Sequence, residues 1–414
     1  MITLGIKGAL KQWNSNDWCL GFILFFSIVY LPIVPIGFII WTLTFWRKIK
    51  RKNYSFWKSL EFLFIVYYLL LVIGMGWTQN LDVGLFKLEN KFSFLLFPIL
   101  FYFSNFTVRR SAILNIILFS SCFSLLIYEI IAVFKSIYYP ENNHWGYFKD
   151  VLFSPFMHRG YYAFYLVLAS LICHAKVYYI NKPKFYTLLF IFISFGVLQT
   201  LSKAGILSWL LLNIILFAST MIRKKKLKTM LLFAGVLTFS LFLFLNLNSS
   251  IKERFEKIPL SSQDIKLKHN NSTESNQARI LMWNASLVSI NKSPFLGYGT
   301  GDDITILEMQ NANDDNQNIA TLRLNSHNQF FTTTLQVGVF GLFILIGIFF
   351  KSCWDFFRGK QLISLLISFC FFCNFLVESF LERQAGIVLF CVLLISLSQK
   401  NTSDKQVITV ENKI

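Results

Sequence analysis

Asn325-Ser-His-Asn-Gln-Phe-Phe331 and its continuation, Thr332-Thr-Thr-Leu-Gln-Val-Gly338-Val-Phe-Gly341, mark the border between a long polar segment and a long apolar one. His327 and Asn328 are the last strongly polar side chains before the chain reads as a membrane helix. Histidine is the one residue type that ordinarily titrates near neutrality, so at such a border it could meet a water-borne partner and a lipid-borne one together. The alternative is a helix-capping Ser or Asn with an incidental histidine beside it.

The composition is that of a membrane protein. Of the 414 residues, 55% are hydrophobic and only 14% are charged, and 47 are Phe. A soluble domain rarely combines so many aromatic residues with so few charges. Apolar runs of about 20 residues recur along most of the chain, which is the length of a membrane-spanning helix. We therefore expect an all-α polytopic membrane protein with about twelve transmembrane helices.

The formal charge of +18 is a topology signal, and its distribution argues against nucleic acid as a partner. Basic residues gather in short clusters between apolar runs, which is typical of cytoplasmic loops under the positive-inside rule. The clusters are Arg47 to Lys52, Arg109-Arg110, Lys182 with Lys184, Arg223 to Lys228, and Lys351 to Lys360.

These signals divide the chain into three parts. Residues 1–247 should form transmembrane helices 1–9 with short loops, residues 248–328 a large periplasmic loop with short helices, and residues 329–414 helices 10–12 and a cytoplasmic tail. Pro32 and Pro35 interrupt the first apolar block, so we expect two short helices there, and a single span is the alternative. In the large loop, Asp302-Asp303 and Asp314-Asp315 have no third ligand at useful spacing, so we expect solvated loops and no metal site.

Alternation from the basic clusters places four separated stretches on one non-cytoplasmic face. They are residues 248–326, 139–159, 202–205 and 382–383. Basic residues are disfavoured on that side, so each needs a reason. Lys203 is the sharpest case, because it lies in a very short break between two hydrophobic helices, where an ionisable residue is costly and usually functional. The alternative is a lysine that snorkels to the interface. The basic and histidine side chains on this face are His158, Arg159, Lys203, Arg254, Arg279, Arg323, His327 and Arg383.

Cations gathered beside an imidazole fit a lipid-linked pyrophosphate. Arginine recognises phosphate oxygens with two parallel hydrogen bonds, and lysine adds a compact charge. Together they would hold a diphosphate and stabilise it as it leaves. His327 would then act as a general base on the attacking hydroxyl, or would position it.

The same residues carry a resemblance to a known family. His327-Asn328, nine further residues and Gly338-Val-Phe-Gly341 resemble the signature of the O-antigen ligase family without a mismatch. Other stretches resemble the family's outer loop, its basic helix break and its last outer turn. They are Arg279-Ile-Leu-Met-Trp283, Ser293-Pro-Phe-Leu-Gly297-Tyr-Gly-Thr-Gly301, Thr200-Leu-Ser-Lys203-Ala-Gly205, and Glu378 to Gly386. The likeness covers most of the chain from Tyr161 onward, whereas the first 150 residues match in hydropathy alone.

The resemblance implies a GT-C-like membrane glycosyltransferase that works without a metal or other cofactor. It implies transfer of O-antigen from undecaprenyl diphosphate to the lipid A-core oligosaccharide at the periplasmic face of the bacterial inner membrane. By position, His327 matches the catalytic histidine and Arg279 the loop arginine. The family commonly has arginine at the position of Lys203. Lysine keeps the positive charge there but lacks the planar guanidinium group. The residues expected to bind substrate are Arg279, Lys203, Arg159, Asn328, Arg254 and Arg383.

Two other readings share parts of this pattern. An O-antigen polymerase or a protein O-oligosaccharyltransferase would use the same donor chemistry with a different acceptor. Because loop shape selects the acceptor, the sequence leaves these alternatives open. A transporter or flippase would more often show internal repeats and broken midplane helices, and neither is clear in the sequence.

Overall fold

The computed structural model describes residues 13–45, 55–104, 106, 109–139, 144–179, 183–223, 275–314 and 316–398. Within these ranges the chain is helical and has no strand. The predicted span over residues 229–247 lies outside them, as do residues 248–274 of the polar segment. The early helices are α2 (Ser15–Val29), α3 (Val34–Phe45), α4 (Leu60–Gly74), α5 (Leu81–Lys91), α6 (Ser93–Phe103) and α7 (Arg110–Tyr138). The later ones are α8 (Arg159–Tyr179), α9 (Pro183–Gln199), α10 (Lys203–Arg223), α14 (Ser275–Lys292), α15 (Asp303–Asn313), α16 (Gln317–Ala320), α17 (Gln329–Arg358), α18 (Leu362–Phe375) and α19 (Gln384–Ser398).

Five helical segments of the described chain are long and apolar enough to cross a membrane: Leu60–Trp77, Arg110–Tyr138, Arg159–Val177, Lys203–Ile222 and Gln329–Arg358. Helices α2, α3, α9, α18 and α19 are apolar but shorter. Large apolar side chains stay exposed along α7, among them Phe119, Leu126, Ile130 and Ile137. Such a surface suits lipid and is unfavourable in water. The protein is therefore a multi-pass membrane protein, and the expected count of about twelve spans remains a prediction.

The first apolar block forms two short helices, as expected from its prolines. Helix α2 ends at Val29, a 3₁₀ turn covers Leu31–Ile33, and α3 starts at Val34. Pro32 sits in the first turn of that 3₁₀ segment, where its missing N–H costs no helical hydrogen bond. Helices α2 and α3 then pack against each other, and α2 also packs against α7.

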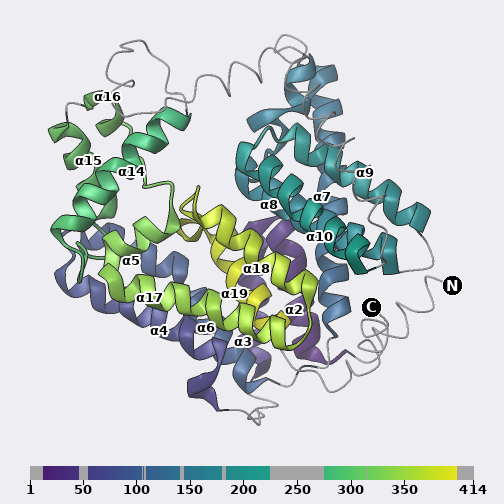
Figure 1. Cartoon of the computed structure of the whole chain (residues 1–414), viewed down its shortest axis with the longest axis horizontal. Coiled ribbons are helices and arrows are strands. Elements are labelled where there is room, and N and C mark those ends of the chain that lie inside the picture. The colour runs from purple at the N-terminus through teal and green to yellow at the C-terminus, as the bar shows by residue number, and fades with distance from the viewer. Residues whose placement is uncertain are drawn as a thin grey trace.

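The helices form two groups with a shared centre (Figure 1). Helices α4, α5, α6 and α17 lie on one side, and α14, α15 and α16 lie beyond α5 and the first part of α17. Helices α7, α8, α9 and α10 lie on the other side, with α18 and α19 between the groups. Helix α8 is almost entirely buried, because α7, α9, α10 and α18 all pack against it.

Helix α17 is broken near its start, at Val337 and Gly338. Gly338 has φ 67° and ψ −164°, a backbone conformation that is essentially restricted to glycine. The turn that leads away from α14 inserts at this break. Tyr298 N–H donates to the Leu335 carbonyl (2.7 Å), Gly299 N–H to the Gln336 carbonyl (3.0 Å), and Val339 N–H to the Pro294 carbonyl (2.9 Å). The backbone groups freed by the break are thus paired by another segment, as apolar surroundings require.

A buried ion cluster joins four segments beside this break. Lys87 pairs with Asp303 and lies 3.3 Å from Glu382, and Lys91 lies 2.7 Å from Glu382. Gln336 Nε2 donates to both carboxylates at 3.2 Å. Desolvation alone would raise the pKa of Glu382, but Lys87 and Lys91 hold it well below its ordinary value. Two lysines and two carboxylates balance, which is how buried charges are tolerated.

This arrangement corrects the expectation for Asp302-Asp303. Both side chains are buried. The Asp302 carboxylate accepts the backbone N–H groups of Gln79 (2.7 Å) and Asn80 (2.9 Å), and Asp303 belongs to the ion cluster. The pair looked solvated because its partners lie more than two hundred residues away in the sequence.

Candidate functional site

The border stretch places His327 directly before the first turn of α17. The Asn328 side chain caps this helix, accepting the N–H groups of Phe330 (2.9 Å) and Phe331 (3.1 Å). The Asn325 side chain accepts the N–H of His327 at 3.0 Å. His327 itself has φ 48°, a left-handed conformation that is uncommon for residues other than glycine. Strained residues of this kind gather at functional sites.

The turn after α18 holds this stretch from the other side. Asn328 Nδ2 donates to the Leu376 carbonyl at 3.1 Å, and the Ser379 hydroxyl donates to Asn325 Oδ1 at 3.2 Å. Ser379 also shares hydrogen bonds with the hydroxyl groups of Ser326 and Thr332. This network fixes residues 376–379 against the start of α17, and Glu378 lies within that turn.

Glu378 brings His327 and Arg279 together. Its Oε1 lies 3.5 Å from His327 Nδ1, and its Oε2 lies 3.1 Å from a terminal guanidinium nitrogen of Arg279. We call these three residues the His327 site. Their side chains are 21–24% exposed, so a ligand could reach them. His327 Nδ1 and Arg279 Nε are both buried, and neither has a hydrogen-bond partner within the described ranges.

Helix α14 supplies two contacts one turn apart. Arg279 binds Glu378, and Trp283, four residues later, donates its indole N–H to the His327 carbonyl at 3.4 Å. Residues at this spacing lie on the same face of a helix. The Arg279–Trp283 stretch thus contacts both the carboxylate and the backbone of the histidine, which accounts for its place in the site.

The charges of the site favour an ionised Glu378. Burial alone would raise the pKa of its carboxyl, but His327, Arg279 and His158 together hold that pKa below its ordinary value. A carboxylate that stays ionised can hold an imidazole in one orientation and stabilise it when it gains a proton.

His158 and Arg383 complete the electrostatic surroundings. The His158 ring is exposed at the start of α8, and desolvation lowers its pKa. Glu378 opposes this shift, whereas Arg383, Arg279 and His327 reinforce it. His158 therefore interacts electrostatically with the three residues of the His327 site. The fold thus brings Arg279 and His327 into one site and places Arg383 within electrostatic range of it. All three residues were expected from the sequence.

The structure places the other expected residues at varying distances from this centre. Arg159, the first residue of α8, pairs with Asp150 in the preceding segment. Lys203 is the first residue of α10. Two residues on, Gly205 packs against Ala163 of α8, close to Tyr161, whose hydroxyl donates to the Phe380 carbonyl at 3.3 Å. Lys203 and the turn carrying Glu378 thus lie at the same end of α8. Arg254 lies outside the described residues.

Two further residues of the site were not singled out from the sequence. Glu378 was noted only as the start of a turn, although an acidic residue directly after an apolar run is itself a signal. His158 was expected on the same face as His327 but was given no role. Asn328 was expected to bind substrate, whereas its contacts here are those of a helix cap and a tether to Leu376. No group of three metal-ligating side chains was found among the described residues.

Fold and site together define a multi-pass helical membrane protein with a histidine–carboxylate–arginine cluster between its helix-connecting segments. The family model described as O-antigen ligase matches residues 188–346, which confirms the resemblance to the O-antigen ligase family predicted from the sequence. This family implies glycosyl transfer of the O-antigen ligase or polymerase type. The matched stretch contains Lys203, Arg279 and His327, whereas Glu378 lies beyond it.

A protein of Haemophilus influenzae is also similar to this chain. It is described as uncharacterised and is 24% identical over 360 residues, which cover 80% of this chain and 84% of that one. The similarity thus extends well beyond the stretch that matches the family model, although the relative's description assigns it no activity.

Proposed function

We propose that this protein transfers a glycan from undecaprenyl diphosphate to the lipid A-core oligosaccharide at the periplasmic face of the bacterial inner membrane. The family match supports the class of reaction. The observation that carries the proposal is the shared Glu378 carboxylate, with His327 Nδ1 on one oxygen and Arg279 on the other. This arrangement supports the proposal because a base and a cation lie side by side.

The orientation of His327 assigns a role to each ring nitrogen. Nδ1 faces the carboxylate, so the neutral tautomer with a proton on Nδ1 is favoured, and Nε2 is left as the acceptor. The 3.5 Å separation exceeds a normal hydrogen bond. Catalytic hydrogen bonds are often long in the free enzyme and shorten when substrate binds. Glu378 is thus a positioning residue, and His327 is the catalytic base.

The transfer step follows from this arrangement. The acceptor hydroxyl oxygen forms a bond to the anomeric carbon of the glycan, and its proton passes to His327 Nε2. The bond between the anomeric carbon and the diphosphate oxygen breaks, and its electron pair leaves with the diphosphate. A positioned general base typically accelerates such a step by about 10²–10⁴-fold.

Cations around the site would hold the leaving diphosphate. Arg279 has its guanidinium beside the reacting histidine, and its Nε is buried without a hydrogen-bond partner in the described part of the chain. Arg383 also acts electrostatically on His158 beside this site, and Lys203 lies at the same end of α8. We assign donor binding to Arg279 first, then to Lys203 and Arg383, with Arg159 and Arg254 as further contributors.

Two alternative functions each have a feature in their favour: a glycosyltransferase with another acceptor, and a transporter. A polymerase or a protein O-oligosaccharyltransferase would use the same donor chemistry with a different acceptor. The break in α17 is of the kind expected of a transporter. Here, however, its freed backbone groups pair with the turn around Tyr298 and Gly299. That pairing favours a structural break over an ion or substrate site.

Deletion of the gene, followed by inspection of surface glycolipids, separates these functions. We expect loss of all long-chain glycan from the lipid A core, with the lipid-linked precursor accumulating. Attachment of single repeats would instead indicate a polymerase. Unglycosylated proteins with intact glycolipid would indicate an oligosaccharyltransferase. Unchanged glycolipid and glycoprotein would contradict glycosyl transfer altogether.

A further inference from the structure

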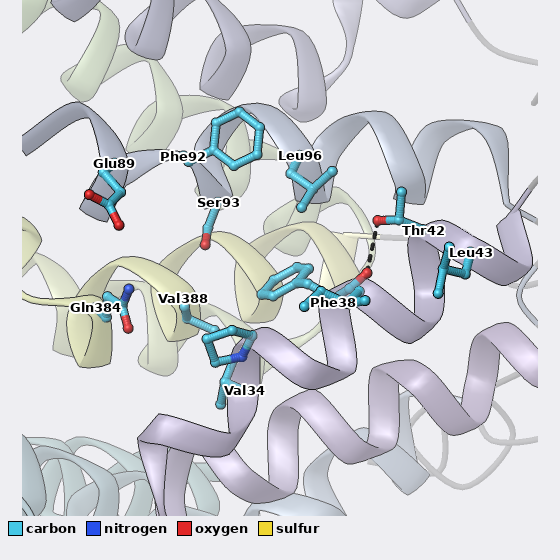
Figure 2. Close-up of a pocket in the computed structure, with 12 residues that line it drawn as sticks. Val34, Phe38, Thr42, Leu43, Glu89, Phe92, Ser93, Leu96, Gln384 and Val388 are labelled. Carbon is cyan, nitrogen blue, oxygen red and sulfur yellow. Dashed lines mark hydrogen bonds between the residues drawn. The ribbon is translucent and has the colours of Figure 1, made fainter. Parts of the chain in front are cut away.

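A surface groove of about 580 Å³ lies between α3, α6 and the start of α19 (Figure 2). Its walls are apolar over most of their length, with Val34, Phe38, Leu96 and Val388 among the lining side chains. Glu89 and Gln384 lie at one end, and Thr42 and Leu43 at the other. The Thr42 hydroxyl donates to the Phe38 carbonyl of its own helix (2.8 Å), so this hydroxyl is already engaged within α3. The groove therefore has one polar end and one apolar end.

The length of the groove matches one leaflet of a bilayer. Along α3 it extends from Val34 to Leu43, a rise of about 14 Å at 1.5 Å per residue. The hydrocarbon core is about 30 Å thick, so the groove covers about half of it. Leu43 lies just before the basic cluster Arg47 to Lys52, whereas Gln384 adjoins Arg383 and the turn of the His327 site. Under the proposed topology the polar end lies in the outer leaflet.

The charge at the polar end selects the headgroup. Among the described residues that line the groove, Glu89 is the only charged one. It lies two residues from both Lys87 and Lys91 on α5, so it points away from the ion cluster that those lysines form. Within the described ranges its carboxylate has no hydrogen-bond or ion-pair partner. A diphosphate or another anionic headgroup would be repelled here, whereas an ammonium group would be attracted.

We propose that this groove binds an outer-leaflet phospholipid whose headgroup carries an ammonium, as in phosphatidylethanolamine. One acyl chain lies along α3, α6 and α19, and the ammonium pairs with Glu89 while Gln384 and Ser93 offer further hydrogen bonds. The site is separate from donor binding and rests on the proposed function only for the leaflet assignment. Its occupant is a resident lipid that fills the space between α3, α6 and the start of α19.

Native mass spectrometry of the full-length protein in detergent tests this. Phosphatidylethanolamine and phosphatidylglycerol are added separately, and bound lipid is counted. We expect phosphatidylethanolamine to bind more tightly than the anionic phosphatidylglycerol. Glu89→Gln should reduce that preference about two- to fivefold, the range of a partly exposed ion pair. Asp82→Asn removes a carboxylate from the same helix outside the groove and should bind lipid like the parent.

A second pair of variants tests the apolar part. Ile39 lines the groove and is 58% exposed, so Ile39→Trp should fill it without disturbing the core. We expect less bound phosphatidylethanolamine in Ile39→Trp and parental binding in Ile36→Trp, a matched change on α3 outside the groove. Equal or tighter binding of an anionic lipid, or unchanged binding in both Glu89→Gln and Ile39→Trp, would overturn the proposal. Neither donor nor acceptor is present, so failure here is distinguishable from failure of glycan transfer.

Discussion

Nδ1 of His327 and Oε1 of Glu378 lie 3.5 Å apart, although the two residues belong to different connections between helices. The histidine precedes α17 and the glutamate follows α18. Two hydrogen bonds join these segments: Asn328 donates to the Leu376 carbonyl, and Asn325 accepts from the Ser379 hydroxyl. A base held by a carboxylate is the common arrangement of acid–base sites. Here Arg279 occupies the other oxygen of the same carboxylate, so one residue orients both the base and a cation.

Ionisation of Glu378 should make stability depend on pH at the acid end. Its folded pKa lies below the ordinary value of 4.5, so the ionised form stabilises the fold. That contribution is complete above about pH 4.5 and is lost as the pH falls through the folded value. We expect the difference in unfolding temperature between the parent and Glu378→Gln to be constant near neutrality and to shrink below about pH 4.5. A difference that stays the same into acid would show that this carboxylate is not held ionised.

Arg279 should contribute mainly to donor binding. Arg279→Ala removes a charge-assisted contact, and we expect kcat/KM for the lipid-linked donor to fall about 10- to 100-fold. Arg279→Lys should recover part of this, because it keeps the charge and loses the fork. Arg323→Ala is the control, since Arg323 is 61% exposed and pairs with Glu308 on the same polar segment. Equal losses in both alanine variants would point to a general effect of charge.

Lys203 should be needed for its charge. We expect Lys203→Arg to retain or raise activity, and Lys203→Ala to raise the KM for the donor more than it lowers kcat. Lys292→Ala removes a lysine from the end of α14, where it donates to Gln310 at 2.7 Å, and serves as the control. Parental kinetics in both Lys203 variants would leave this lysine only an interfacial role.

The break in α17 should depend on Gly338. A side chain there would overlap with the Phe295 carbonyl, and the backbone conformation is itself unfavourable for other residues. We expect Gly338→Ala to destabilise the protein by about 1–3 kcal/mol and to lower its unfolding temperature in detergent. Gly347→Ala in the same helix meets open space and should be neutral or slightly stabilising. Similar unfolding temperatures for both variants would mean that the break is not maintained.

Much of the fold could be predicted from apolar run length and proline position. The two helices of the first block follow from Pro32 and Pro35, and the start of α17 follows from Asn328. The break at Gly338 could not be found in this way. A glycine in an apolar run equally suits close helix packing, and only the inserted turn around Tyr298 reveals the change in backbone direction.

The site was predictable where one residue type implied the chemistry. His327 and Arg279 were expected together, and the fold joins them through Glu378. The pairings of Asp303 with Lys87 and of Glu378 with His327 depend on long-range contacts that no local pattern encodes. Arg159 was expected to bind substrate because of its charge; the structure adds its pairing with Asp150, and its part in donor binding stays a prediction.

The most direct test measures transfer by purified protein in liposomes, with a lipid-diphosphate-linked glycan and a lipid A-core acceptor. We expect His327→Ala to lower kcat by at least about 10²-fold while donor binding and folding stay close to the parent. The kcat of Glu378→Gln should lie between those of the parent and of His327→Ala, because the base remains but loses its orientation. Transfer by His327→Ala at the parental rate would show that this imidazole does not activate the acceptor.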